Sequence, residues 1–253
     1  MSRILLVEDN PRYASSAEQY LASRGQGVAL ARRIQAVTLA RDYSEAMDKL
    51  RNPEFDGMIT DCFFPEITGR GATSLGQTLV RRMADSDPHE RKITQGLETL
   101  GKYVDLEDPL VKSYARFAAA VYSPDSPVFK AVETVFNSLG KQGATLAFKN
   151  TIELSYSEHR LPRDYYGALM KAMEESEANQ PLGILVAERA DELALPLVLA
   201  TSTSHHDLLT QPVQNYASRR GWILVDCGPN REDDKASAEF WQRAFSELER
   251  KLR

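Results

Sequence analysis

The sequence predicts an α/β fold in which a parallel sheet is interrupted by a long helical insertion. Short apolar runs, typical of parallel strands buried on both faces, recur at both ends of the chain and alternate with helical patterns. Three of these runs end in polar side chains, at Glu8 and Asp9, at Asp61 and at Thr201. The roughly 110 residues between the two α/β segments show helical periodicity and no strand alternation.

The first α/β segment alternates strands and helices over residues 1–69. Asn10 followed by Pro11 indicates an N-cap and the first position of a helix. Asp42 and Glu45 form a capping box before an amphipathic helix, with Asp in place of the usual Ser or Thr. The expected strands are 4–7, 37–40 and 57–60.

The second α/β segment covers residues 182–253 and repeats the same alternation. Helices are expected over 182–193 and 212–219, and apolar residues at helical spacing between Phe240 and Leu252 predict a third. The strands of this segment are expected at 197–200 and 222–225.

The segment 70–181 is predicted to be an all-helical subdomain. Its expected helices are 74–84, 93–103, 110–122, 127–139 and 163–176. The preferred placement puts this insertion between the third strand and the helix 182–193, directly after the loop that contains Asp61. In the alternative placement, 71–83 is the third helix of the α/β domain and the insertion begins later.

Composition excludes several classes of protein. A net charge of −5 argues against a nucleic-acid binder, and no apolar run approaches the roughly 18 residues of a membrane-spanning helix. Two cysteines are too few for a disulfide scaffold and fit a reducing compartment. The N-terminus runs straight into a strand and leaves no room for a signal peptide, so a cytoplasmic protein that binds neither nucleic acid nor membrane is expected.

The polar strand ends define the candidate site. The carboxyl ends of parallel strands line one crevice, so Glu8, Asp9 and Asp61 are expected to meet there beside the Thr201 hydroxyl. Oxygen ligands of this kind suit Mg²⁺. A plainer reading gives Glu8 and Asp9 only a favourable interaction with the dipole of the following helix, and gives Thr201 only a backbone hydrogen bond.

Three segments of the chain resemble the receiver domain of bacterial two-component response regulators. They are the acidic pair in Leu5–Asn10, the segment in which Asp61 is followed by Pro65 and Gly69, and the strand with its terminal hydroxyl in Pro196–Thr201. The resemblance covers about residues 1–69 and 182–253. It implies a flavodoxin-like fold with five parallel strands in the order 2-1-3-4-5.

The resemblance also implies a function. Asp61 would accept a phosphoryl group from a histidine kinase or phosphotransfer protein, and Thr201 would be the switch hydroxyl. Mg²⁺ would be held by Glu8, Asp9, Asp61 and the backbone carbonyl of Phe63. Such a protein is not an enzyme in its own right, and it acts through a downstream protein partner or as a homodimer. Trp222 is either the aromatic partner of the switch or, as we favour, a core residue.

One element of the receiver pattern is not found where it is expected. The family places a lysine near the end of strand five, whereas residues 222–229 contain no lysine and Asp226 adds a negative charge. Arg231 or a residue of the insertion is an alternative source of positive charge. Two interpretations follow: a phosphorylated switch with weakened coupling, or a phosphorylation-independent pseudo-receiver that serves as an interaction module.

Overall fold

A computed structural model describes residues 2–24, 34–51, 54–123, 125–153, 164–204, 207–227 and 232–252. The chain divides into two compact units, one of Met1–Met83 with Tyr165–Arg253 and one of Ala84–Asp164. The two ends of the expected insertion 70–181, residues 70–83 and 165–181, therefore belong to the α/β unit. The second unit is smaller than that insertion.

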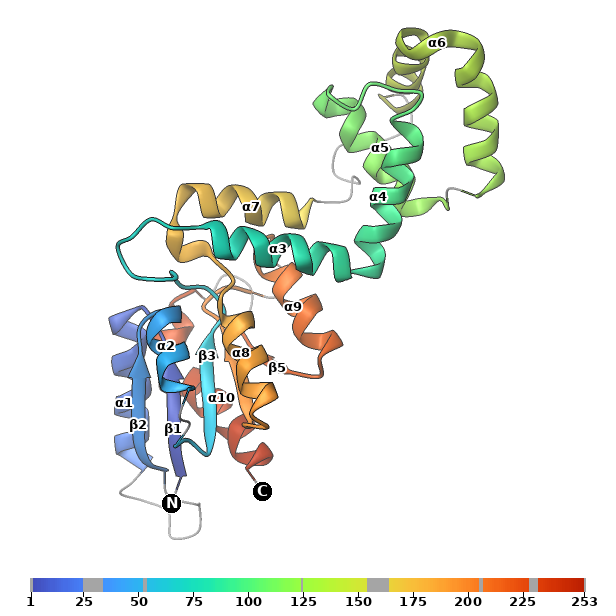
Figure 1. Cartoon of the computed structure of the whole chain (residues 1–253). Coiled ribbons are helices and arrows are strands. Elements are labelled where there is room, and N and C mark those ends of the chain that lie inside the picture. Colours follow the sequence, from blue (N-terminus) through green and yellow to red (C-terminus); the bar gives the residue numbers. More distant parts are fainter. Residues whose placement is uncertain are drawn as a thin grey trace. The chain divides into compact units, whose positions relative to one another are not determined.

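The α/β unit is built on a five-stranded sheet in the order β2-β1-β3-β4-β5 (Figure 1). The strands are β1 (Ser2–Val7), β2 (Ile34–Ala40), β3 (Gly57–Asp61), β4 (Leu197–Ala200) and β5 (Ile223–Val225), and every neighbouring pair is parallel. All five residues of β3 and all four of β4 are buried, as expected of central strands in a parallel sheet that is covered on both faces. The flavodoxin-like α/β fold and its strand order are confirmed.

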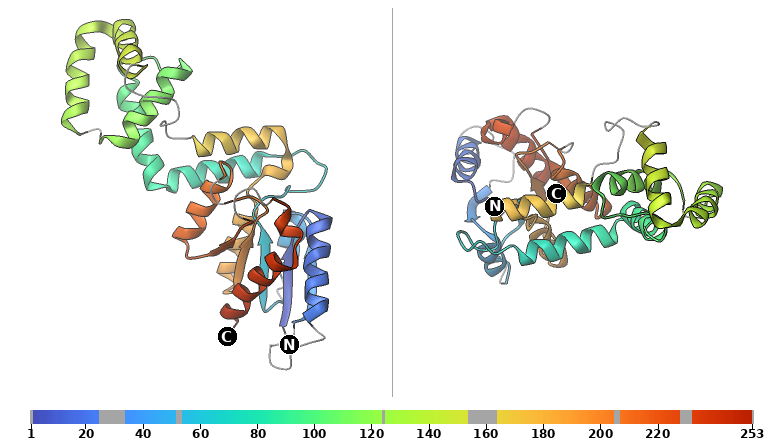
Figure 2. Two further views of the ribbon diagram at one scale, coloured as in Figure 1. Left: turned by 180° about the vertical axis from the view of Figure 1, so that it is seen from behind. Right: turned by 90° about the horizontal axis from the view of Figure 1, so that it is seen from above.

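Helices cover both faces of this sheet (Figure 2). On one face, α1 (Pro11–Arg24) packs with α10 (Ala238–Lys251), and their apolar sides form a core with residues of β1, β3 and β4. On the other face, α2 (Tyr43–Lys49) packs beside α8 (Gly183–Glu192), and Tyr216 of α9 (Thr210–Arg219) donates a hydrogen bond to Glu188 of α8. Because α8 contacts both β3 and β4, it occupies the place of the third helix, as the preferred placement of the insertion requires.

Two predicted caps are present, at the helices that follow β1 and β2. The Asn10 side chain accepts a hydrogen bond of 3.0 Å from Arg12 N–H at the start of α1. The Asp42 carboxylate accepts one of 2.8 Å from Glu45 N–H at the start of α2. Glu45 reaches back to the N–H of Arg41 rather than to that of Asp42, so the capping box is shifted by one residue.

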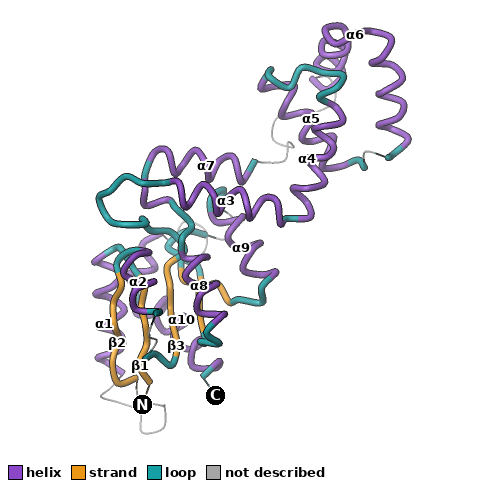
Figure 3. The backbone as a smooth tube through the Cα atoms, in the orientation of Figure 1, coloured by secondary structure: helices purple, strands orange, loops and turns teal. Residues whose placement is uncertain are grey.

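A helical region connects β3 to β4, and a loop of residues 62–73 leads into it (Figure 3). It comprises α3 (Ser74–Ser86), α4 (Pro88–Leu100), α5 (Pro109–Val121), α6 (Pro127–Glu153), α7 (Tyr165–Glu175) and the short 3-10 helix η2 (Glu177–Asn179). No strand occurs among the residues described between β3 and β4. None of the helices in the described part of the chain is long and apolar enough to cross a membrane.

Two helices of this region differ from their predicted bounds. Helix α4 begins five residues earlier than expected because Asp87 caps it and Pro88 fits its first turn. The range of α6 contains two helical stretches separated at Gly140, whose φ of 64° and ψ of 167° are not helical. The first stretch ends where the predicted helix 127–139 ends, and the second was not predicted. The unit Ala84–Asp164 has its own buried cluster, which includes Val111, Tyr114, Phe129, Phe136 and Phe148.

Candidate functional site

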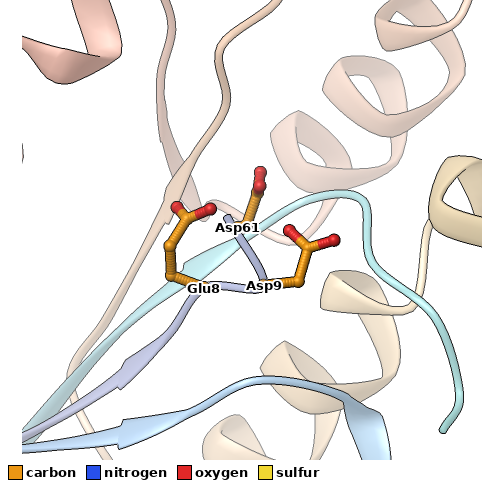
Figure 4. A group of neighbouring side chains, drawn as sticks. All are labelled: Glu8, Asp9 and Asp61. Atoms are coloured by element: carbon orange, nitrogen blue, oxygen red, sulfur yellow. The ribbon is translucent and has the colours of Figure 1, made fainter. Parts of the chain in front are cut away.

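Three carboxylates meet at the carboxyl ends of β1 and β3 (Figure 4). Glu8 and Asp9 directly follow β1, and Asp61 is the last residue of β3. One carboxylate oxygen from each residue lies within 4.8 Å of the others. Glu8 is 1% exposed and Asp61 7% exposed, so two of these charges are almost completely removed from water. The sequence prediction that these three acids gather at one edge of the sheet is confirmed.

In both Glu8 and Asp61, one carboxylate oxygen accepts a hydrogen bond from a backbone amide and the other lies beside an ammonium group. Glu8 Oε1 accepts a hydrogen bond of 3.2 Å from Asn10 N–H, and Asp61 Oδ1 accepts one of 2.6 Å from Cys62 N–H. The other oxygen of each carboxylate faces Lys235, whose Nζ lies 2.7 Å from Glu8 Oε2 and 2.9 Å from Asp61 Oδ2. Lys235 therefore bridges the two strand ends.

The expectation that the site has no lysine is wrong. Lys235 lies in the 3-10 helix η3 (Glu232–Ala236), well beyond the end of β5, and its side chain returns to the strand ends. It is 0% exposed, and Nζ also lies 3.4 Å from the carbonyl oxygen of Ala200 at the end of β4. The positive charge of the site thus comes from a residue that follows β5 at a distance in the sequence, and not from the end of β5 itself. Arg231, the alternative source of this charge, lies outside the described residues.

Burial and mutual repulsion determine how the acids titrate. Burial, reinforced by the charge of Asp61, raises the pKa of Glu8 to about 8 and that of Asp9 to about 6, although Lys235 opposes both shifts. Burial lowers the pKa of Lys235, but Asp61 and Glu8 outweigh that effect and raise it overall. When all three carboxylates are ionised, they and the ammonium carry a net charge of −2. A divalent cation would neutralise that charge, so these residues could hold a metal ion.

A cleft of about 250 Å³ opens beside these carboxylates. It is lined by residues from four parts of the α/β unit: Asp9, Asn10, Tyr13, Asp61, Phe63, Ala178, Asn179, Ser202, Thr203 and Leu209. Phe63 is therefore beside the cleft, as its proposed role requires, and its carbonyl as a metal ligand stays a prediction. Tyr13 was not singled out from the sequence. Its ring lies over Lys235, with Nζ 5.3 Å from the ring centroid, and it shares a hydrogen bond with Ser202.

The predicted hydroxyl at the end of β4 belongs to a chain of threonines. Thr201 is 1% exposed, and its Oγ1 lies 2.9 Å from Oγ1 of Thr203. Thr203 in turn bonds the hydroxyl of Thr210, the first residue of α9. Ser202 and Thr203 line the cleft. Thr201 is therefore linked to the cleft by its hydrogen bond with Thr203. The role of Thr201 as the switch hydroxyl stays a prediction.

The remaining candidates lie apart from this arrangement. Trp222 precedes β5, at the end of the strand away from the acids, and packs against Tyr216 with ring centroids 6.1 Å apart. It is 7% exposed, which agrees with the core reading. Cys62 is completely buried, and burial together with Asp61 raises its pKa, so its thiol is a poor nucleophile.

The segment that returns from α7 to α8 was not predicted from the sequence, and it also contacts the site. Gly183 N–H donates to the carbonyl of Cys62 at 3.1 Å, and Phe64 N–H donates to the carbonyl of Gln180 at 3.1 Å. Phe64 and Pro181 also form an isolated parallel bridge. Residues 180–183 therefore hold the backbone that directly follows Asp61.

Comparison with known proteins gives no relative from which a role could be transferred: no family model, no curated protein and no solved structure matches the chain. The fold and the geometry of the acidic cluster are thus the basis for any functional conclusion.

Proposed function

We propose that this chain is a response-regulator-like signalling protein in which Asp61 accepts a phosphoryl group from a histidine kinase. A carboxylate oxygen of Asp61 forms a bond to phosphorus while the bond from phosphorus to the donor imidazole nitrogen breaks, and the electron pair leaves on that nitrogen. Asp9 and Glu8 are the further ligands of Mg²⁺, which when bound neutralises charge on the transferred group. The output is made through protein contacts.

The arrangement of Lys235 with Glu8, Asp9 and Asp61 carries this proposal. Phosphoryl transfer depends mainly on positioning and on charge stabilisation, and the site offers both a cluster of metal-ligating oxygens and a fixed ammonium. Lys235 lies 2.9 Å from Asp61 Oδ2, so it is within reach of a group attached to that oxygen. The cleft beside Asp61 provides the space through which a donor approaches.

A second candidate function is a phosphorylation-independent interaction module. The observation that favours it is the closed ion pair: Lys235 already occupies one oxygen of both Glu8 and Asp61, and all three side chains are buried. In this reading, Lys235 is a permanent structural counter-charge that holds the strand ends together, and the surface of the α/β unit binds partners in a single state.

Intact-protein mass spectrometry separates the two candidates. The protein is incubated with acetyl phosphate and a series of Mg²⁺ concentrations, and the receiver proposal expects the gain of one phosphoryl mass, which chelation of Mg²⁺ abolishes. Asp61→Asn is expected to abolish the gain, whereas Asp56→Asn, a matched change at a carboxylate that accepts a hydrogen bond from Arg3 N–H away from the cluster, is expected to leave it intact. Wild-type protein that gains no mass at any Mg²⁺ level would favour the interaction module.

A further inference from the structure

Gln180 is a buried polar side chain that joins three separate segments. It is 0% exposed, and its Nε2 donates to the carbonyl oxygens of Ala72 at 2.8 Å and Glu177 at 3.1 Å. Its Oε1 accepts from Gly76 N–H, in the first turn of α3, at 3.2 Å. The amide group thereby ties the beginning of α3 to η2, and both of its ends are satisfied.

The backbone of Gln180 extends this connection to the site. Its carbonyl accepts the hydrogen bond from Phe64 N–H, three residues after Asp61. Glu177 adds a parallel link, because its carboxylate accepts hydrogen bonds from the N–H groups of Gly69 at 2.7 Å and of Gly71 in the loop that follows. Any displacement of η2 would therefore be passed to the backbone that carries Asp61.

The helices on either side of Gln180 leave it no freedom to move. Gly76 is buried where α3 meets α7, and a Cβ at this position would lie 2.8 Å from Gln180 Oε1 and 2.9 Å from the sulfur of Met173. Asn179 Nδ2 donates to the carbonyl of Ala172 in α7 at 2.9 Å. The two helices at the ends of the inserted region and the loop of Asp61 thus share one tightly packed contact.

We infer that Gln180 is a positioning residue for Asp61, through which α3 and α7 control the reactivity of the phosphoacceptor. This inference rests on the proposed function. Gln180 does not contact the reacting atoms; its carbonyl holds the N–H of Phe64, while Gly183 holds the carbonyl of Cys62. Gln180 thereby helps to fix the backbone that follows Asp61 and so the direction of the Asp61 carboxylate. Because such coupling is reciprocal, a phosphoryl group on Asp61 alters the hydrogen bonds at the start of α3.

The test compares phosphorylation rates of full-length variants with acetyl phosphate and Mg²⁺, below the unfolding temperature of each variant. Gln180→Met keeps the size of the side chain and removes its amide bonds, and Gly76→Ala pushes on the same amide from α3. Both are expected to lower the rate at saturating donor by about tenfold, the scale of a small misplacement of the nucleophile. The Mg²⁺ affinity and the donor concentration at half-maximal rate are expected to stay unchanged.

Gly96→Ala is the control, because Gly96 of α4 is crowded even more closely, by Ala119, but lies in the unit Ala84–Asp164. It is expected to lower thermal stability without changing the phosphorylation rate. Unchanged rates in both test variants overturn the inference and leave the proposed function standing. A slower rate that follows entirely from weaker Mg²⁺ binding overturns it as well. Wild-type protein that is not phosphorylated removes the proposed function together with this inference.

Discussion

Gly183, the first residue of α8, lies directly against the backbone carbonyl of Asp61. A Cβ at position 183 would collide with that oxygen and would lie 2.8 Å from Cα of Cys62. The crowding involves backbone atoms on both sides, so no side-chain rotation can relieve it. Glycine at this position is thus a condition for the close approach of α8 to the end of β3.

Gly183→Ala is expected to destabilise the protein by about 3 kcal/mol, the upper part of the range for overpacking in a rigid environment. Chemical denaturation followed by circular dichroism measures the change. Gly143→Ala is the control, because an added Cβ there meets only the Leu139 side chain at 3.3 Å in a helix. A loss below about 1 kcal/mol for Gly183→Ala would contradict the described packing.

Lys235→Met is expected to cost about 3–5 kcal/mol in metal-free buffer, because it leaves Glu8 and Asp61 as buried acids without their counter-charge. Mg²⁺ is expected to recover more stability in this variant than in wild type, since the cation replaces the missing positive charge. Thermal denaturation with and without Mg²⁺ measures both effects. Lys251→Met, at the end of α10, serves as the control and is expected to change neither value by more than a few tenths of a kcal/mol. Equal effects of the two substitutions would refute the role of the bridge.

The raised pKa values of Glu8 and Asp9 predict that the metal-free protein loses stability as the pH rises. The native state holds a proton on Glu8 up to a pKa of about 8, whereas the unfolded chain releases it near 4.5. Asp9 acts in the same way between 3.8 and about 6. The free energy of unfolding therefore falls between pH 4 and pH 8. Denaturation of wild type and Glu8→Gln across this range checks the sign, and the difference between them is expected to be largest at pH 8.

The same pKa values set the pH dependence of metal binding. A cation must displace the proton from Glu8, so the Mg²⁺ affinity of wild type is expected to rise from pH 6 to pH 8. Isothermal titration calorimetry in two buffers of different ionisation enthalpy would detect the released proton. Glu8→Gln should bind more weakly, with a flatter pH profile, and a wild-type affinity independent of pH would argue against Glu8 as a ligand.

The unit Ala84–Asp164 is expected to respond separately to a core mutation. Phe136 and Phe148 pack edge to face with centroids 6.0 Å apart inside its cluster. Phe136→Ala is expected to destabilise this unit by about 3–5 kcal/mol and to leave Mg²⁺ binding at Asp61 unchanged. Hydrogen exchange resolved by peptide measures the first effect and calorimetry the second. Parallel loss of protection in β1, β3 and β4 would show instead that the two units unfold together.

Much of the α/β unit was predictable because its signals are local. Unbroken apolar runs fixed the strands, and Asn10 and Asp42 marked the starts of the helices that follow β1 and β2. The break at Gly140 was also predictable, because glycine readily adopts the positive φ at which a helix stops. The helical stretch that follows it was not predicted, because Gly143 within it lowers the intrinsic helix propensity of that segment.

The acidic part of the site was also predictable, whereas its counter-charge was not. Glu8, Asp9 and Asp61 follow strands directly, so the topology of the sheet brings them together. Lys235 follows an acidic stretch that has the composition of a solvent-exposed turn, and its position depends on how η3 folds back. One signal was present: Lys235 is the single lysine between residues 172 and 250. Two buried acids and a third beside them need a cation, and this was the nearest lysine available after β4.

The pairing of β3 with β4 makes the assembly of the sheet a late event in folding. Asp61 lies opposite Ala200 in the register, although more than half of the chain separates them. Closing so long a loop costs entropy before any contact between the two strands compensates for it. The intervening helices form from local contacts and shorten the effective loop, so we expect them to be protected from hydrogen exchange before the centre of the sheet. The acidic site, which needs both strands and Lys235, then forms last.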